Sequence, residues 1–181
     1  MSMNARNLEI TRVVSRGLLP VLPHEFDELE KTWTGYNNDQ RKLSLQRQEA
    51  IDQSTAGLHE NTAAEAIASD LRVTEHAVDT AGQYLSRAIT FGFPDTADEV
   101  TLGSIFFLEG KEDEPGFLMG TNTSKLPSEI EKMLPEDYQL VTLSSPMGKA
   151  MLGAKVGDEI VYDCPLGRQK VKVVKIAILT F

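Results

Sequence analysis

The strongest constraint on the fold is a pair of long helical patterns separated by a short polar stretch that contains a glycine. In the first pattern, apolar residues recur at steps of three and four from Phe26 to Leu43, and in the second from Ile67 to Ile89. These steps place apolar side chains along one stripe of a helix. Because residues 52–61 between them are rich in turn and cap formers, the spacing predicts an antiparallel coiled-coil hairpin over residues 23–92. The stripes also suit an ordinary helical bundle, but the sequence offers no third or fourth long helix.

The hairpin is expected to begin next to Pro23, since proline suits the first turn of a helix and the acids that follow complement its dipole. Its tip is expected near residues 52–61. Gln40, Arg47 and Thr74 occupy phases where apolar residues are expected, so the seam should weaken along its length.

In residues 93–181 the sequence pattern changes to short apolar runs typical of strands, which predicts a compact α+β domain. A capping-box spacing of Ser128 and Glu131 predicts a short helix, Ser128 to Leu134. The strands are expected at Val100 to Leu108, Gly116 to Met119, Gln139 to Leu143, Glu159 to Tyr162 and Gln169 to Leu179. Residues 1–22 contain Pro20 and precede Pro23, which predicts an N-terminal arm that packs locally or frays.

Bulk properties exclude several functions. A formal net charge of -9 argues against a protein that coats nucleic acid, so we expect no binding to free DNA. No apolar run is long enough for a membrane span, no signal peptide is evident and the lone Cys164 suits a reducing compartment, which predicts a cytoplasmic protein with no membrane partner. The sequence shows no metal-ligand cluster, phosphate loop or nucleophile elbow, so it is not expected to be an enzyme.

Residues 144–158 are the most informative stretch of the sequence. Pro146 suits the first turn of a short helix with Ser144 or Ser145 as its cap, and Gly153 suits the stop. Gly157 and Asp158 then read as a turn before the strand that starts at Glu159.

Residues 144–158 resemble part of the C-terminal domain of the GreA/GreB transcript cleavage factors, which carry Ser-Pro-x-Gly-(Arg/Lys)-Ala-Leu-(Leu/Ile)-Gly followed by Val-Gly-Asp. Here the residues read Ser-Pro-Met-Gly-Lys-Ala-Met-Leu-Gly, then Val-Gly-Asp. The resemblance implies an FKBP-like fold for residues 93–181 and RNA polymerase as the partner. It assigns polymerase docking to Pro146, Gly148, Lys149, Gly157 and Asp158, so residues 144–158 are called here the docking segment. Compared with the family, residues 110–137 are longer and more acidic, which implies a surface insertion.

The resemblance also implies that the hairpin enters the secondary channel of the polymerase. There two tip acids help to hold a Mg²⁺ ion shared with the polymerase, which cleaves backtracked RNA with its own active site. Glu60 matches the second tip acid and is the candidate catalytic and metal-facing residue. Gly57 stands in place of the first acid, and Asp52 or Glu65 would have to substitute for it. Arg41, Lys42 and Arg47 are the candidate contacts to the nascent RNA 3′ end, although they also suit a solvated helix face.

Three functions therefore stay open from the sequence. The resemblance favours a transcription elongation factor whose hairpin enters the secondary channel and promotes cleavage of backtracked RNA by the polymerase. The first alternative is a secondary-channel regulator that docks without stimulating cleavage. The second alternative is an FKBP-like peptide-binding or prolyl isomerase module. The sequence does not give the oligomeric state.

Overall fold

A computed structural model describes residues 3–53, 62–121 and 126–180, and the chain divides into two compact units. The sheet unit comprises Met1–Phe26 and Ala88–Phe181, and the hairpin unit comprises Asp27–Arg87. The sequence placed these boundaries at residues 22 and 92. They move because Glu25, in the first turn of the long helix, accepts hydrogen bonds from Gly120 and Thr121, and because the strand after the second helix pairs with residues 19–21.

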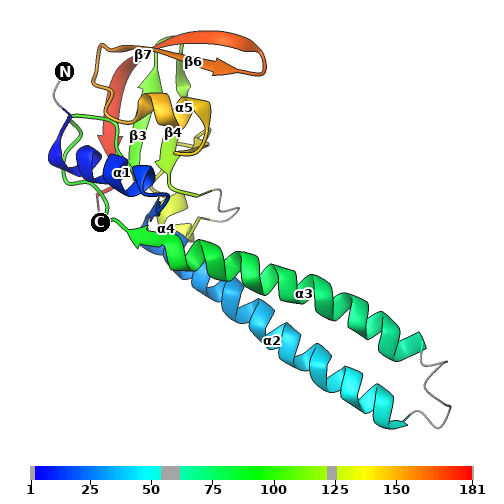
Figure 1. Cartoon of the computed structure of the whole chain (residues 1–181). Helices are drawn as coiled ribbons and strands as arrows, with labels where there is room; N and C mark the ends of the chain where they lie inside the picture. The colour runs from blue at the N-terminus through cyan, green and yellow to red at the C-terminus, as the bar shows by residue number, and fades with distance from the viewer. Residues whose placement is uncertain (1–2, 54–61, 122–125, 181) are drawn as a thin grey trace. The chain divides into compact units, whose positions relative to one another are not determined.

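The hairpin unit is built from two long helices, α2 (Pro23–Gln53) and α3 (Thr62–Arg87), which run side by side (Figure 1). The predicted hairpin and its start at Pro23 are thus confirmed. Trp33 packs against Gly82, where an added Cβ would lie 3.3 Å from the indole Nε1. The seam is thin, since only Ala64 and Ala81 are buried among the hairpin-unit residues that the structure describes.

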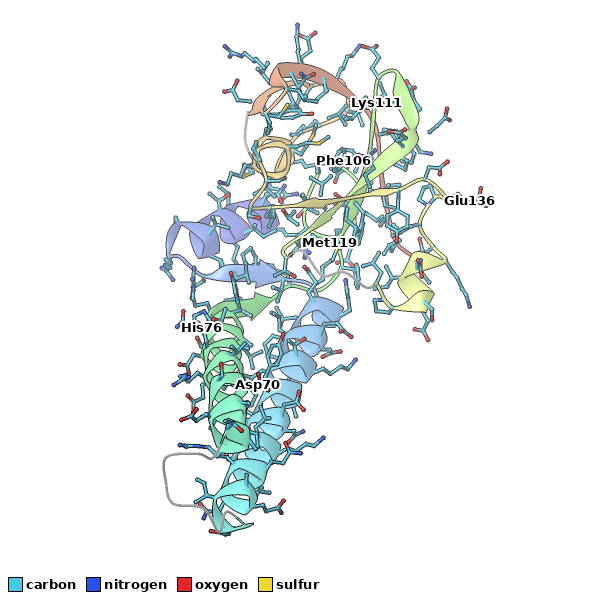
Figure 2. The ribbon with its side chains drawn as sticks, turned by 90° about the vertical axis from the view of Figure 1, so that its right-hand side faces the viewer. Asp70, His76, Phe106, Lys111, Met119 and Glu136 are labelled. Carbon is cyan, nitrogen blue, oxygen red and sulfur yellow. The ribbon has the colours of Figure 1, made fainter. Side chains whose placement is uncertain are left out.

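The sheet unit holds a five-stranded sheet in the order β5-β4-β3-β7-β6, which confirms the predicted α+β class. All neighbouring strands are antiparallel except β4 and β5, which are parallel. Helices α1 (Ala5–Ser15) and α5 (Pro146–Met151) lie on one side of the sheet and α4 (Ser128–Glu131) on the other (Figures 1 and 2). The strands are β3 (Ser104–Leu108), β4 (Lys111–Met119), β5 (Gln139–Thr142), β6 (Glu159–Cys164) and β7 (Gly167–Ile178). The FKBP-like relationship of this domain stays a prediction.

Large apolar side chains fill the interior of the sheet unit. Phe106, Phe117, Leu118 and Met119 are each 0% exposed, and Figure 2 shows Phe106 and Met119 among the strands. The Phe106 ring lies over its cross-strand partner Gly116, where an added Cβ would come within 2.2 Å of the ring. A side chain at position 116 would therefore displace the centre of the core.

Residues 1–22 do not form a separate arm. They contain α1 and β1 (Leu19–Val21), which pairs in parallel with β2 (Ala88–Thr90). Ile10 is 0% exposed in the core, and Arg6 donates from Nε to Thr101 Oγ1 at 3.2 Å and from Nη2 to the Leu102 carbonyl at 3.1 Å. The helix was missed because polar side chains, rather than an apolar stripe, make much of its contact.

The acidic segment 110–137 is not simply a surface insertion. Residues 111–114 are exposed, but β4 continues inward and residues 115–119 are buried. The strand predicted from Val100 begins only at Ser104, since residues 101–104 form a turn in which the Ser104 hydroxyl donates to the Thr101 carbonyl at 2.7 Å. The predicted helix at Ser128 is shorter than expected and ends at Glu131.

Candidate functional site

The first half of the docking segment forms the short helix α5. Ser145 is its cap: the Gly148 N–H donates to Ser145 Oγ at 3.0 Å, and that hydroxyl donates to the Thr142 carbonyl at 2.7 Å. Pro146 takes the first helical position, where its missing N–H costs nothing. Local sequence chemistry therefore explains the start of α5, as predicted.

Gly148 is required by a close approach of backbone. An added Cβ would lie 2.0 Å from the Thr142 carbonyl oxygen, far inside van der Waals contact. Gly148 is buried, so its predicted role in docking is indirect: it allows α5 to lie against the end of β5.

The second half of the docking segment is a turn held by several backbone contacts. Gly157 has a φ of 94°, which glycine adopts at little cost, and its N–H donates to the Val173 carbonyl at 2.7 Å. The Asp158 carboxylate accepts the Lys155 N–H at 2.9 Å, and the Asp158 N–H donates to the Lys155 carbonyl at 3.0 Å. Gly157 and Asp158 thus shape the turn.

The five predicted docking residues divide into two kinds. Pro146, Lys149 and Gly157 are exposed, whereas Gly148 is buried and Asp158 is half-buried and bonded within its own turn. The exposed members offer a cation and an apolar ring to a partner. The other two give the segment its shape.

Glu99, a buried carboxylate beside the docking segment, was not identified as a functional candidate from the sequence. Glu99 is 3% exposed and accepts hydrogen bonds from the Asn4 N–H and from Asn7 Nδ2, both at 3.1 Å. Its other oxygen lies 3.3 Å from Lys155 Nζ. Burial pushes the pKa of Glu99 upward, but these hydrogen bonds and the Lys155 ammonium outweigh it, so its pKa lies below the usual value.

A second buried carboxylate ties the start of α2 to the end of β4. Glu25 is 0% exposed and accepts from the Leu22 N–H at 2.7 Å, the Gly120 N–H at 3.1 Å, and the Thr121 N–H and hydroxyl at 2.6 and 2.7 Å. Burial raises the pKa of Glu25, and the hydrogen bonds oppose that rise. The sequence placed Glu25 only as an acid near a helix start, because its partners at residues 120–121 are remote in the chain.

The candidate RNA contacts on α2 are exposed but do not share one face. At 3.6 residues per turn, Lys42 lies about 100° around the helix axis from Arg41, and Arg47 about 140° from Lys42. The three side chains are therefore spread around α2, and an RNA backbone that runs along one face of the helix would not meet all three.

The predicted tip is only partly described by the structure. Gly57 and Glu60 lie outside the described residues. Asp52 is exposed on the last turn of α2, where its Oδ1 accepts from Gln48 Nε2 at 2.8 Å. Glu65 is exposed in the first turn of α3. Within residues 3–53, 62–121 and 126–180, no three His, Cys, Asp or Glu side chains come together as a possible metal site. In the same residues, none of the helices combines the length and the apolar character of a membrane span.

Comparison with known proteins places the chain among transcription factors. The sequence model of the family described as "Transcription elongation factor, GreA/GreB, C-term" matches residues 95–178. The transcription inhibitor protein Gfh1 of Thermus aquaticus is 30% identical over 159 residues, covering 82% of this chain and 96% of that protein. The transcription elongation factor GreA of Limosilactobacillus fermentum is 30% identical over 128 residues, covering 70% and 76%.

Among solved structures, the crystal structure of GreA factor homolog 1 (Gfh1) of Thermus thermophilus matches 88% of this chain and 99% of that one, with 22% identity and a TM-score of 0.39. The sequence relatives are transcription factors rather than enzymes. The matched residues 95–178 include α5 and the whole docking segment. The chain therefore belongs to the GreA/GreB family of transcription elongation factors.

Proposed function

We propose that the chain binds bacterial RNA polymerase through the docking segment and regulates elongation with its hairpin in the secondary channel. The observation that carries this proposal is the docking segment itself. Its cap, its buried Gly148 and its Gly157–Asp158 turn fix the backbone, and they leave Pro146 and Lys149 exposed for a partner. The family supplies the kind of partner.

The mode of action that we favour is docking without stimulated RNA cleavage. Two observations support it. Gly57 occupies the position of the first tip acid, so the tip carries less negative charge to hold a metal ion. The relative that covers 82% of the chain is a transcription inhibitor, whereas the GreA relative covers 70%.

Stimulated cleavage is the second candidate, and Glu60 motivates it as the matching tip acid. Asp52 would be the substitute acid. Its exposed carboxylate is a hard oxygen donor of the kind that Mg²⁺ prefers, although Gln48 already occupies one oxygen. A Mg²⁺ ion shared with the polymerase would supply the charge stabilisation for hydrolysis. Arg41 and Lys42 would then hold the RNA 3′ end by its phosphates.

The prolyl isomerase alternative gains no support from Phe106 and Phe117, two aromatic residues of the central strands. Phe106 and Phe117 are completely buried in the core, so neither can line a peptide groove.

A single reaction separates these candidates: a backtracked polymerase complex with radiolabelled RNA, Mg²⁺ and the purified chain. We expect stable binding and slowed RNA extension without shortened RNA. Shortening that disappears with Glu60→Ala, while binding persists, would establish the cleavage candidate. Failure to bind the polymerase at all would refute both.

A further inference from the structure

The Glu99 carboxylate joins two regions that are remote in the sequence. On one side it accepts the Asn4 N–H and the Asn7 side-chain amide of α1, both at 3.1 Å. On the other it lies 3.3 Å from Lys155 Nζ, within the docking segment. Because Glu99 is 3% exposed, these partners replace the water that an ionised carboxylate requires.

Backbone and side-chain packing reinforce the same junction. The Val100 N–H donates to the Ala154 carbonyl at 2.7 Å, and the Gly153 N–H donates to the Val100 carbonyl at 2.8 Å. A Cβ added at Gly153 would come within 2.9 Å of the Met3 methyl group. The start of α1 therefore lies directly against the end of the turn that follows α5, on the side of the sheet that both helices share (Figure 1).

Lys155 extends this contact to the Gly157–Asp158 turn of the docking segment. Its N–H donates to Asp158 Oδ2 at 2.9 Å, and its carbonyl accepts from the Asp158 N–H at 3.0 Å. One residue therefore holds the Glu99 junction with its ammonium and the Gly157–Asp158 turn with its backbone. Lys155 is thus the side-chain link from Glu99 to the turn, beside the backbone hydrogen bonds of Val100 with Gly153 and Ala154.

We infer that Glu99, backed by Asn4 and Asn7 of α1, is a positioning residue that holds the docking segment in its polymerase-binding geometry through Lys155. The inference rests on the proposed function. It gives the N-terminal helix a role in docking even though the helix itself need not touch the polymerase. It also explains why a carboxylate, rather than an apolar residue, occupies this buried position.

The test is a double-mutant cycle on the affinity for RNA polymerase. Glu99→Gln keeps the shape but removes the charge that Lys155 faces, and Lys155→Met removes the cation. Each single change is expected to raise Kd about five-fold, and the double variant about as much as either alone, because the two residues act as one unit. Glu109→Gln is the matched control, since Glu109 forms an exposed pair with Lys172 at 3.4 Å, and we expect no change in Kd.

The Kd values are measured well below the unfolding temperature of every variant, and amide hydrogen exchange of residues 146–158 is followed in parallel. The inference expects faster exchange there in Glu99→Gln. Lys149→Glu tests the docking surface itself and should raise Kd about ten-fold.

Normal affinity in Glu99→Gln together with weak binding in Lys149→Glu would overturn the positioning role and leave the docking proposal intact. Normal affinity in both would overturn the two together. Additive losses in the cycle would show that Glu99 does not act through Lys155, which also overturns the inference.

Discussion

The sheet unit and the hairpin unit differ most in how their side chains are packed. In the sheet unit, close approaches such as Gly148 on Thr142 and Gly116 under Phe106 leave no room for one more carbon atom. In the hairpin unit, Trp33 and Tyr36 on the seam remain 37% and 39% exposed. Residue identity in the sheet unit is thus dictated largely by packing, whereas most positions of the hairpin are free to serve function or to vary.

The same substitution in each unit should have opposite signs. Gly148→Ala forces a Cβ to within 2.0 Å of a carbonyl oxygen, and we expect it to lower the free energy of unfolding by about 3 kcal/mol. Gly35→Ala places its Cβ in open space within α2 and should raise stability by about 0.5–1 kcal/mol. Urea denaturation followed by circular dichroism measures both. If both variants changed the free energy of unfolding in the same direction and by the same amount, the two units would not differ in packing as described.

The Glu25 carboxylate offers the next largest effect. Glu25→Ala removes the acceptor of the Leu22, Gly120 and Thr121 N–H groups, so we expect a loss of about 2–3 kcal/mol in the free energy of unfolding. Glu28→Ala is the control one turn on: its pair with Lys31 at 3.2 Å is solvent-exposed and should contribute about 0.5 kcal/mol or less. Similar losses in both variants would mean that the buried hydrogen bonds of Glu25 stabilise the fold no more than the exposed ion pair of Glu28.

The ionised Glu99 carboxylate should make the free energy of unfolding depend on pH in the acidic range. Its folded pKa lies below the usual glutamate value of 4.5, so its ionised form stabilises the fold above that pH, and the contribution is lost as pH falls through the lower folded pKa. The wild type should therefore lose stability relative to Glu99→Gln as pH falls from neutral into that range. Denaturation of both proteins at neutral and acidic pH measures the difference. Parallel pH profiles would contradict the assignment.

How far the sequence predicted these features depends on whether the cause was local. The hairpin, the start of α2 at Pro23 and the capping of α5 follow from spacing and from chemistry within a few residues. The partners of Glu99 lie 95, 92 and 56 positions away, and those of Glu25 other than Leu22 lie 95 and 96 positions away. No periodicity encodes such pairs. The burial of α1 was missed for the same reason.

The smallest effects are expected on the outer surface of the hairpin. Leu45 and Val73 are large apolar side chains that remain 66% and 70% exposed, and each stands two positions from a half-buried seam residue, Leu43 and Leu71. Two positions along a helix turn a side chain by about 200°, which points it away from the seam. Leu45→Lys and Val73→Lys should therefore change the free energy of unfolding by less than about 0.5 kcal/mol.

The fluorescence of Trp33, the one tryptophan of the chain, reports unfolding in the hairpin unit directly. Leu43→Lys is the matched control on the same helix, and because Leu43 is half-buried in the seam it should shift the Trp33 transition by clearly more than Leu45→Lys. If Leu45→Lys leaves stability unchanged but weakens binding to the polymerase, the exposed leucine is a contact with that partner. A loss of stability as large as that of Leu43→Lys would instead place Leu45 in a packed surface and remove the contrast between the two units.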